Sequence, residues 1–434
     1  MLIEFRVGNY RSFKDIVTFS MVASAIKEHP DDNIFSIDNS NLNLLKSGVI
    51  YGSNASGKSN LIEAMGFMKF FIMSSSKETN IGNKIGVERF RLSSETDKKP
   101  SFFEITFIQE GIEYRYGFEV EQEKVQSEWL FSSPKNKERR LFTRDGKDFT
   151  IGTYFKEGKK FKDLTRENAL LLSVAAQFNG EISTKIFEWF LKLKIISGLE
   201  DNYSGFSIEK LDDRDFKNKI LKLLNIADID INDIQKKKVN MPVKFLQEEL
   251  IKIFPPDIIE KSEKIEAVSL HTLHKKYNEK KEFSAFEEFD FSNNESHGTQ
   301  KLFNLSGPII DALTHGKILI VDELSARLHS KLTQNIIKLF NSHKNSKNAQ
   351  LIFATHDLSL LRKELFRRDQ IWFTEKDPYG VTDLYSLVEY KLPKTKGKVR
   401  NDASYARDYI LGKYGAVPYT GNFDFFFEDI NTEQ

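Results

Sequence analysis

A glycine-rich segment near the N-terminus, Gly52–Ser59, decides which class of fold this chain is expected to adopt. It reads GSNASGKS and fits the pattern G-x-x-x-x-G-K-[ST], in which successive backbone N–H groups can point at phosphate oxygens. A short apolar strand is predicted before it, at Lys46–Tyr51, and an amphipathic helix after it, at Asn60–Met73. The N-terminus of that helix adds a partial positive charge. We therefore predict an α/β fold whose strand-to-helix turn binds the phosphates of a nucleotide.

Each residue type in this loop has a predicted role. The Lys58 ammonium group reaches the β- and γ-phosphates of ATP, and the Ser59 hydroxyl group binds Mg²⁺. A chance loop of Gly and Ser is the alternative, but the flanking strand and helix argue against it. The predicted nucleotide-binding set is Gly52, Ser53, Asn54, Ala55, Ser56, Gly57, Lys58, Ser59 and Asn60.

The segment Lys317–Leu324, KILIVDEL, has the pattern of a buried strand that ends in two carboxylates. An acidic residue at the carboxyl end of a central strand lies at the mouth of an α/β sheet, where ligands bind. We predict that Asp322 holds Mg²⁺ directly or through water. Glu323 is the predicted general base, which orients and polarises the attacking water.

A histidine follows the next predicted strand, Gln350–Phe353, in the sequence ATHD. The imidazole of His356 could contact the γ-phosphate and respond to its loss. A histidine that caps the end of a strand is the alternative, but its position one strand beyond Asp322 and Glu323 favours a role in the site.

The segment Glu295–Leu302, ESHGTQKL, precedes a helix that leads to the Asp-Glu strand. Ser296 and Gly298 offer a hydroxyl group and backbone N–H groups to an anion at the start of that helix. Since the chain already holds phosphates with its own loop, this second group is expected to contact the nucleotide of another copy. The alternative is a plain helix start, capped by Ser296 or Thr299.

Composition limits the class of protein. The 64 Lys and Arg residues nearly balance the 63 Asp and Glu residues, so any nucleic-acid contact must come from local patches. There is no cysteine, which excludes disulfides and thiolate metal sites. The first residues lack the apolar core of a signal peptide, and the longest apolar helix, Leu61–Met73, is too short to span a bilayer. We therefore expect no membrane association and a cytoplasmic location.

The remaining pattern predicts three parts. Residues 1–180 are expected to form a lobe with the phosphate loop and an antiparallel sheet, with strands at Ser101–Gln109, Ile112–Glu121 and Leu141–Thr143. Residues 181–292 are expected to form a mixed, mainly helical insertion without a long coiled coil. Residues 293–434 are expected to hold the second set of motifs and a C-terminal extension. Further helices are predicted at Glu167–Gln177, Glu181–Leu193, Glu209–Leu224, Gln300–Leu313 and Lys331–Asn341.

The order of these motifs resembles the head domain of ATP-binding-cassette ATPases of the SMC, RecF and OLD branch. The opening FRVGNYRSF is similar to their first strand and turn, which implies that Arg11 faces the nucleotide. More specifically, the chain resembles the RloA-like and abortive-infection ATPases of bacteria and archaea. The segments that carry this resemblance are ESHGTQKLF, VDELSARLHSKL, LIFATHD, RRDQIWFTEKD and YILGKYGAVP.

The resemblance implies a homodimer or higher homo-oligomer with ATP at the interface. Ser296 and Gly298 would then act on the partner's nucleotide, and His356 would be the switch residue. Gln177 lies at about the place of the glutamine that links Mg²⁺ to the lobe, although an ordinary surface glutamine is the alternative. After Glu323 the family has an acidic or Asn residue and then Leu-His-Pro, whereas this chain continues LSARLHS, which alters the expected dimer-contact loop.

Relatives of this type are associated with anti-phage defence. The resemblance implies a sensor or scaffold ATPase that controls a separate effector, such as a TOPRIM-like nuclease or a toxin. Only about 80 residues follow His356, so an appended nuclease domain is not expected. A RecF-like ATPase of DNA repair is the main alternative. An ABC transporter subunit is a third, which the antiparallel sheet and the insertion disfavour.

Overall fold

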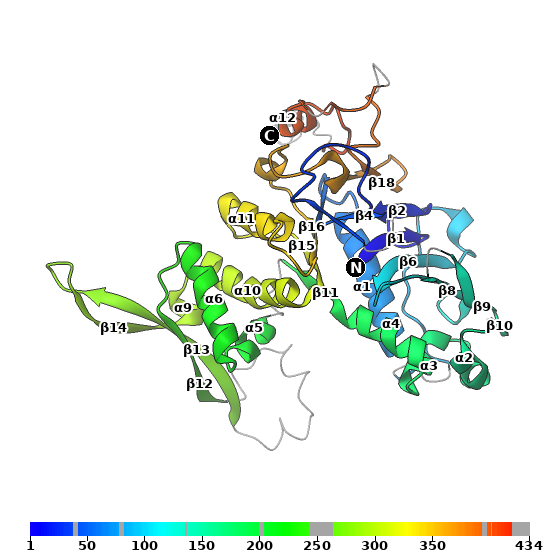
Figure 1. The fold of residues 1–434 in the computed structure, drawn as a ribbon, viewed down its shortest axis with the longest axis horizontal. Coiled ribbons are helices and arrows are strands. Elements are labelled where there is room, and N and C mark those ends of the chain that lie inside the picture. Colours follow the sequence, from blue (N-terminus) through cyan, green and yellow to red (C-terminus); the bar gives the residue numbers. More distant parts are fainter. Residues whose placement is uncertain are drawn as a thin grey trace, which may run out of the picture. The chain divides into compact units, whose positions relative to one another are not determined.

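The computed structural model describes residues 1–37, 42–77, 82–134, 137–198, 204–242, 264–392, 397–400 and 402–418 of the 434-residue chain (Figure 1). The chain divides into two compact units. Unit 1 comprises Met1–Leu199, Ala312–Ala326 and Thr333–Gln434, and unit 2 comprises Glu200–Asp311 and Arg327–Leu332.

Unit 1 contains a seven-stranded sheet in which all neighbours are antiparallel. The predicted antiparallel lobe is thus confirmed. The sequence pattern missed β8, because two of its inward positions hold Glu128 and Ser132 and interrupt the apolar alternation. In spatial order the strands are β10 (Asp148–Ile151), β9 (Arg139–Asp145), β8 (Val125–Ser133), β7 (Ile112–Val120), β6 (Ser101–Gln109), β1 (Leu2–Gly8) and β2 (Val17–Ser20).

The second sheet of unit 1 has six strands, of which the first five are parallel. Its inner strands β5 and β16 are buried at every position, as expected for a parallel sheet that is covered on both faces. Parallel strands end at the same edge, so the segments that follow β5, β15 and β16 meet there. The spatial order is β11 (Leu193–Ser197), β15 (Ile318–Asp322), β16 (Gln350–Ala354), β5 (Ser47–Gly52), β17 (Ile371–Lys376) and the antiparallel β18 (Thr382–Ser386).

Helix α1 (Lys58–Ser74) joins the two sheets of unit 1 into one core. Its residues Leu61, Met65 and Phe71 belong to a buried cluster that also contains Phe103 of β6 and Ile320 of β15. The other elements of this unit are a small pair of strands, β3 (Ile34–Ser36) and β4 (Asn43–Leu45), and the helices α2 (Lys156–Phe161), α3 (Leu171–Gln177), α4 (Glu181–Lys192), α11 (Ser330–Asn341, whose first turn belongs to unit 2) and α12 (Tyr405–Ile410).

Unit 2 differs from the expected mainly helical insertion, because its described part contains a three-stranded antiparallel sheet. The sequence hid these strands because β14 is exposed almost throughout and its residues do not alternate between apolar and polar. The elements are α5 (Ser204–Lys210), α6 (Arg214–Ile226), β12 (Asp233–Pro242), β13 (Lys264–Tyr277), β14 (Phe283–Asp290), α9 (Phe291–Asn294) and α10 (His297–His315), which runs on into unit 1.

The predicted boundaries of the insertion also differ from this division. Residues 181–198 belong to unit 1, because β11 pairs with β15 in the parallel sheet. The helix predicted at Glu209–Leu224 is two helices, since the Asp213 side chain accepts hydrogen bonds from the backbone N–H groups of Asp215 and Phe216 and starts α6 afresh. Across the described ranges, no helix combines the length and apolarity needed to cross a bilayer.

Candidate active site

The loop Gly52–Ser59 joins β5 to α1, as the sequence predicts, and two of its residues have left-handed backbone angles. Gly57, the N-cap of α1, has a φ of 112°, and Ala55 has a φ of 60°. A Cβ atom at Gly52 would lie 2.4 Å from the hydroxyl oxygens of both Ser56 and Thr374. A glycine is therefore required at position 52 because the neighbouring atoms are too close for a Cβ atom, and at position 57 because of the left-handed backbone conformation.

Side chains from distant parts of the chain brace this loop. The Ser56 hydroxyl group lies 2.6 Å from that of Thr374 on β17, and the Thr382 hydroxyl group on β18 donates to the Ser56 carbonyl oxygen at 2.8 Å. Asn60 donates to the Ser12 hydroxyl oxygen at 2.7 Å, which fixes the turn after β1 against the start of α1. Sequence reasoning missed Thr374 and Thr382, because neither lies in a recognisable motif.

Lys58 is buried at the centre of the site. Its ammonium group donates to the carbonyl oxygens of Gly52 and Ser53 at 3.1 Å each. Burial lowers the pKa of Lys58, whereas the nearby carboxylates of Glu323 and Asp322 oppose that shift. The lysine thus shares one electrostatic environment with both predicted carboxylates.

Asp322 ends β15 and has an unused ligand atom. Its Oδ1 atom is buried and has no hydrogen-bond partner in the described part of the chain. An orphaned carboxylate oxygen fits a hard cation, and Ser59 at the start of α1 offers a second oxygen. Both residues therefore suit Mg²⁺, which when bound would polarise the phosphate oxygens of ATP.

Glu323 follows in a strained conformation, with a φ of 55°. Its side chain is only 16% exposed. Burial raises the pKa of its carboxyl group, Lys58 lowers it and Asp322 raises it further. A raised pKa suits a general base, because it strengthens the affinity of the carboxylate for a proton.

His356 lies beside this base, with its Nε2 atom 3.4 Å from Glu323 Oε1. Burial lowers the pKa of His356, and the positive charge of Lys58 lowers it further. A lowered pKa favours the neutral imidazole, which can donate or accept a hydrogen bond. The structure brings together Lys58, Asp322, Glu323 and His356, which the sequence assigned from three separate segments.

The contacts of Arg11 lie outside this group. Its guanidinium group forms ion pairs with Glu63 of α1 and, at 3.4 Å, with Glu88, and it lies over the ring of Tyr10. The turn that carries it contacts α1 through Ser12. A role of Arg11 toward nucleotide would require it to leave Glu63.

Ser296 and Gly298 belong to unit 2, and Gln177 ends α3 of unit 1. The Ser296 hydroxyl oxygen accepts the Thr299 N–H at 3.1 Å and starts α10. This is the helix-capping role that the sequence analysis gave as the alternative. Ser296 is also exposed. Gln177 lies exposed at the end of α3 and, among described residues, makes no hydrogen bond to the site. The roles of Ser296, Gly298 and Gln177 stay predictions.

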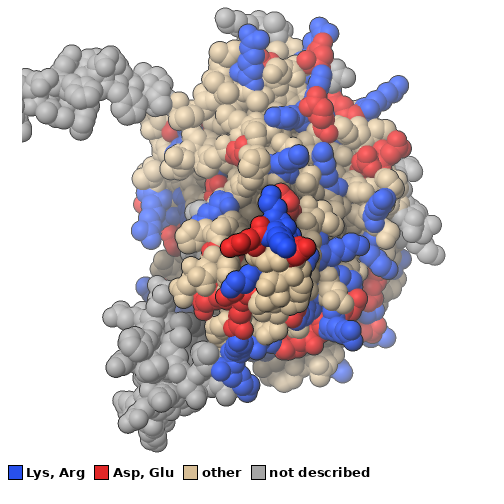
Figure 2. Space-filling view, turned by 90° about the vertical axis from the view of Figure 1, so that its left-hand side faces the viewer, with Lys and Arg blue, Asp and Glu red and all other residues tan. Residues whose placement is uncertain are grey.

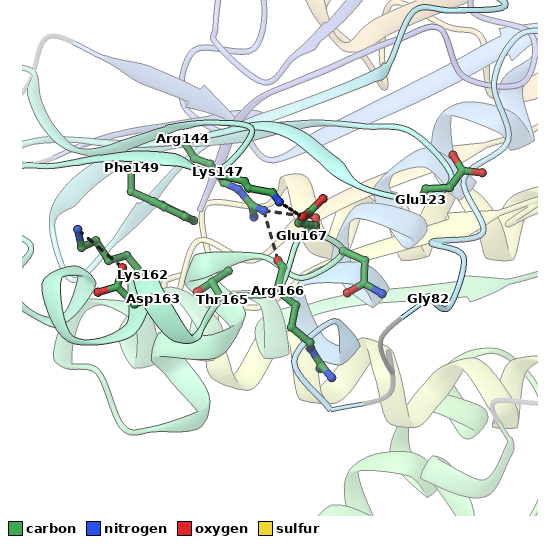
Figure 3. Close-up of a pocket in the computed structure, with 11 residues that line it drawn as sticks. Gly82, Glu123, Arg144, Lys147, Phe149, Lys162, Asp163, Thr165, Arg166 and Glu167 are labelled. Carbon is green, nitrogen blue, oxygen red and sulfur yellow. Dashed lines mark hydrogen bonds and ion pairs between the residues drawn. The ribbon is translucent and has the colours of Figure 1, made fainter.

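A cavity of about 530 Å³ in unit 1 is lined by none of the predicted residues. Figure 3 shows that Arg144, Lys147 and Lys162 already interact with other residues of the cavity wall. Lys147 pairs with Glu167 at 2.5 Å, and the Arg144 guanidinium group donates to backbone carbonyl oxygens, including that of Ala169 at 2.7 Å. Because its strongest charges are used internally, we assign no ligand to this cavity.

Comparison with known families gives one match, which covers residues 49–362. The matching family is described as "AAA domain, putative AbiEii toxin, Type IV TA system". The matched range includes the loop, the Asp-Glu pair and His356. No curated protein matches the chain.

Several solved structures are similar to the chain at low identity. One is an SMC head domain from Thermotoga maritima, with 13% identity and a TM-score of 0.39 over 89% of this chain and 98% of that one. Another is an SmcHead bound to the C-winged helix domain of ScpA, with 14% identity and a TM-score of 0.37 over 89% and 97%. A third is an Smc head domain with an extended coiled coil bound to the C-terminal domain of ScpA, derived from Pyrococcus furiosus, with 14% identity and a TM-score of 0.35 over 89% and 96%.

Proposed function

This chain belongs to the family described as "AAA domain, putative AbiEii toxin, Type IV TA system", and we propose that it binds and hydrolyses ATP as a homodimer or higher homo-oligomer. The observation that carries the proposal is the meeting of Lys58, Asp322, Glu323 and His356 at the carboxyl edge of one parallel sheet. This is where ligands bind in open α/β sheets.

In the proposed reaction, Lys58 moves its ammonium group from the loop carbonyls of Gly52 and Ser53 to the phosphates of the substrate. Glu323 accepts a proton from the attacking water, and His356 is held beside it to contact the γ-phosphate. Ser296 and Gly298 of a second copy complete the site in this proposal.

Two variants separate binding from chemistry. Lys58→Ala should weaken ATP binding by about 10- to 100-fold, since hydrogen bonds to charged groups contribute about 1.5–3 kcal/mol. Glu323→Gln should keep ATP binding but lower kcat by about 10²- to 10⁴-fold, the usual contribution of a general base.

The Glu323→Gln variant should also accumulate as an ATP-bound dimer on size exclusion, because binding to the associated state stabilises it. Hydrolysis at the wild-type rate by this variant would refute the catalytic assignment. Lack of ATP binding by the wild-type protein would refute the proposed function itself.

We further propose that the ATPase is the sensor or scaffold of an abortive-infection system and controls a separate effector chain, in the cytoplasm. The family and the resemblance to RloA-like and OLD-branch ATPases support this role. A RecF-like function in DNA repair is the alternative. A neighbouring gene for a TOPRIM-like nuclease or toxin would favour defence, and recombination genes there would favour repair.

An exposed ribbon in unit 2 is the surface best suited to an effector protein. Strand β12 pairs with β13 only as far as Leu273, so from His274 onward β13 pairs with β14 alone (Figure 1). Isolated two-stranded ribbons are only marginally stable in water. On this ribbon the large apolar side chains of Tyr277, Phe283 and Phe286 are 51%, 55% and 54% exposed. The rings of Phe283 and Phe286 contact each other at 5.1 Å between centroids.

The charges on this ribbon favour a protein over a nucleic acid. Within the described residues, Lys275, Lys280 and Lys281 form no ion pair, so they can attract carboxylates of a partner. However, acidic residues alternate with them, and Lys276 and Lys237 already pair with Glu287 and Glu288. Figure 2 likewise shows acidic and basic side chains interleaved on the face that it displays. A nucleic-acid surface would need a basic stripe. We therefore propose that an apolar, acidic segment of the effector adds along β14.

The docking surface is tested by Phe283→Ser together with Phe286→Ser. This double variant should lose co-purification with the effector and lose defence, while ATP hydrolysis is unchanged. Ile226→Ser is the control, because Ile226 is also an exposed apolar residue of unit 2, at 70%, but lies on α6. Retained co-purification by the double variant would contradict docking on the ribbon, and loss of bound nucleic acid instead would indicate the other class of partner.

A further inference from the structure

We propose that Ser325 and Thr355 are positioning residues for hydrolysis, which couple the turn of the general base Glu323 to the turn of the switch residue His356. The inference rests on the proposed ATPase function and deepens it. It also assigns a role to the segment after Glu323, where this chain departs from the family pattern.

The two turns follow neighbouring strands and are tied together twice. Strands β15 and β16 run parallel, with Val321 opposite Phe353. At the end of β16, the Ala354 carbonyl oxygen accepts the Leu324 N–H at 3.2 Å. One residue further on each side, the hydroxyl oxygens of Ser325 and Thr355 lie 2.6 Å apart. The second tie is therefore a strong hydrogen bond between side chains, immediately beside the reacting groups.

The Thr355 hydroxyl group is fully buried and holds its own turn as well. Its oxygen accepts the Asp357 N–H at 3.0 Å, so its hydrogen is free to be donated to Ser325. On the other side of the turn, the buried Tyr51 hydroxyl group donates to the Asp357 carbonyl oxygen at 3.2 Å. His356 thus sits between two anchored residues, and Ser325 extends this anchoring to the turn of Glu323.

Glu323 needs such an anchor because its backbone is strained. Its left-handed φ of 55° is unfavourable for a residue with a side chain, and it persists only where neighbouring contacts impose it. The 3.4 Å separation between Glu323 and His356 depends on both turns keeping their places. If the hydroxyl bond is lost, the Glu323 turn can relax, and small displacements of a general base lower the rate strongly.

The test measures kcat and KM for ATP in Ser325→Ala and Thr355→Val. Each should lower kcat by about 10-fold, the equivalent of one hydrogen bond, with little change in KM, because neither residue belongs to the phosphate loop. Ser325→Thr and Thr355→Ser keep a hydroxyl group and should restore most of the rate. Ser359→Ala is the control, since Ser359 lies three residues beyond His356 and its hydroxyl group has no partner in the described part of the chain.

Epistasis separates positioning from general destabilisation. The double variant Ser325→Ala/Thr355→Val should be no slower than either single variant, because both remove the same bond. In a His356→Ala background, Ser325→Ala should lower kcat little further, since the Glu323 and His356 turns no longer need to be aligned.

Three results would overturn the inference: full activity of Ser325→Ala, an equal loss in both backgrounds, or failure of the hydroxyl-retaining variants to rescue. Ser325 is partly exposed, so its variant should fold even if Thr355→Val does not. If the wild-type protein itself hydrolyses no ATP, the proposed function fails, and this outcome is distinct from the others.

Discussion

Gly198, the residue after β11, lies directly against the backbone of Glu323, the proposed general base. A Cβ atom at this position would lie 2.2 Å from the carbonyl oxygen of Glu323 and 2.3 Å from that of Asp322. Both obstacles are backbone atoms, so no side-chain rotation can relieve the contact. We therefore predict that Gly198→Ala displaces the Asp-Glu turn.

The size of the effect follows from these distances. Cβ atoms essentially never approach other heavy atoms closer than 3.0 Å, so the turn must move by about 0.8 Å. A misplacement of about 1 Å can cost about 100-fold in rate. Overpacking of this kind also destabilises a protein by about 1–3 kcal/mol. Because the phosphate loop is untouched, ATP binding should change little.

Steady-state hydrolysis, ATP affinity and thermal unfolding test this prediction together. Gly198→Ala should lower kcat by about 100-fold and retain ATP binding and a cooperative unfolding transition. Gly66→Ala is the control: Gly66 lies within α1, and a Cβ atom there meets nothing within 4 Å. This variant should be as active as the wild type and more stable by about 0.5–1 kcal/mol. If Gly198→Ala hydrolyses ATP at the wild-type rate, the reasoning about the Asp-Glu turn is wrong.

Three further predictions concern the same site. Mixing Ser296→Arg protein with Lys58→Ala protein should restore part of the hydrolysis, since each mixed dimer keeps one intact composite site; no recovery despite proven heterodimers would contradict action between copies. Because burial raises the pKa of Glu323, the acid limb of the kcat–pH profile should lie above about 4.3, the ordinary Glu value, and a limb at or below that value would argue against this base. Because the folded-state pKa of Glu323 is raised, its ionised carboxylate destabilises the folded protein above that pKa and has no such effect below the pKa of the unfolded chain. Glu323→Gln should therefore raise Tm at pH 7.5 but not at pH 4. Calorimetry at both pH values checks the sign of this effect.

Local patterns were sufficient for the parts of the site that depend on short stretches of chain. The loop at Gly52–Ser59 lies between β5 and α1 as predicted, and Asp322 ends β15. Four apolar residues before two acids have the pattern of a buried strand that ends at a sheet edge, and the phosphate loop upstream supported that interpretation. For the same reason the strands that hold the motifs, and the helix after the loop, were found almost to the residue.

Sequence patterns failed to predict strands in which apolar and polar residues do not alternate. Strand β8 carries the buried Glu128, whose carboxylate accepts the N–H groups of Leu171 and Leu172 at the start of α3. A charged residue that points inward looks like a surface residue in the sequence. The strands of unit 2 were missed for the opposite reason, because β14 has almost no buried side to produce a pattern.

The sequence alone determined the predicted chemistry of this site, since residue types and spacing decide which groups could hold phosphate, Mg²⁺ and a proton. Only the tertiary structure decided how these groups are held. Thr374 braces the loop from more than 300 residues away, Gly198 leaves room for the Asp-Glu turn, and Ser325 bonds to Thr355 across two strands. None of these contacts leaves a trace in the local sequence, because each depends on the order in which distant strands enter one sheet. That order is set by the packing of the whole core and not by any single segment.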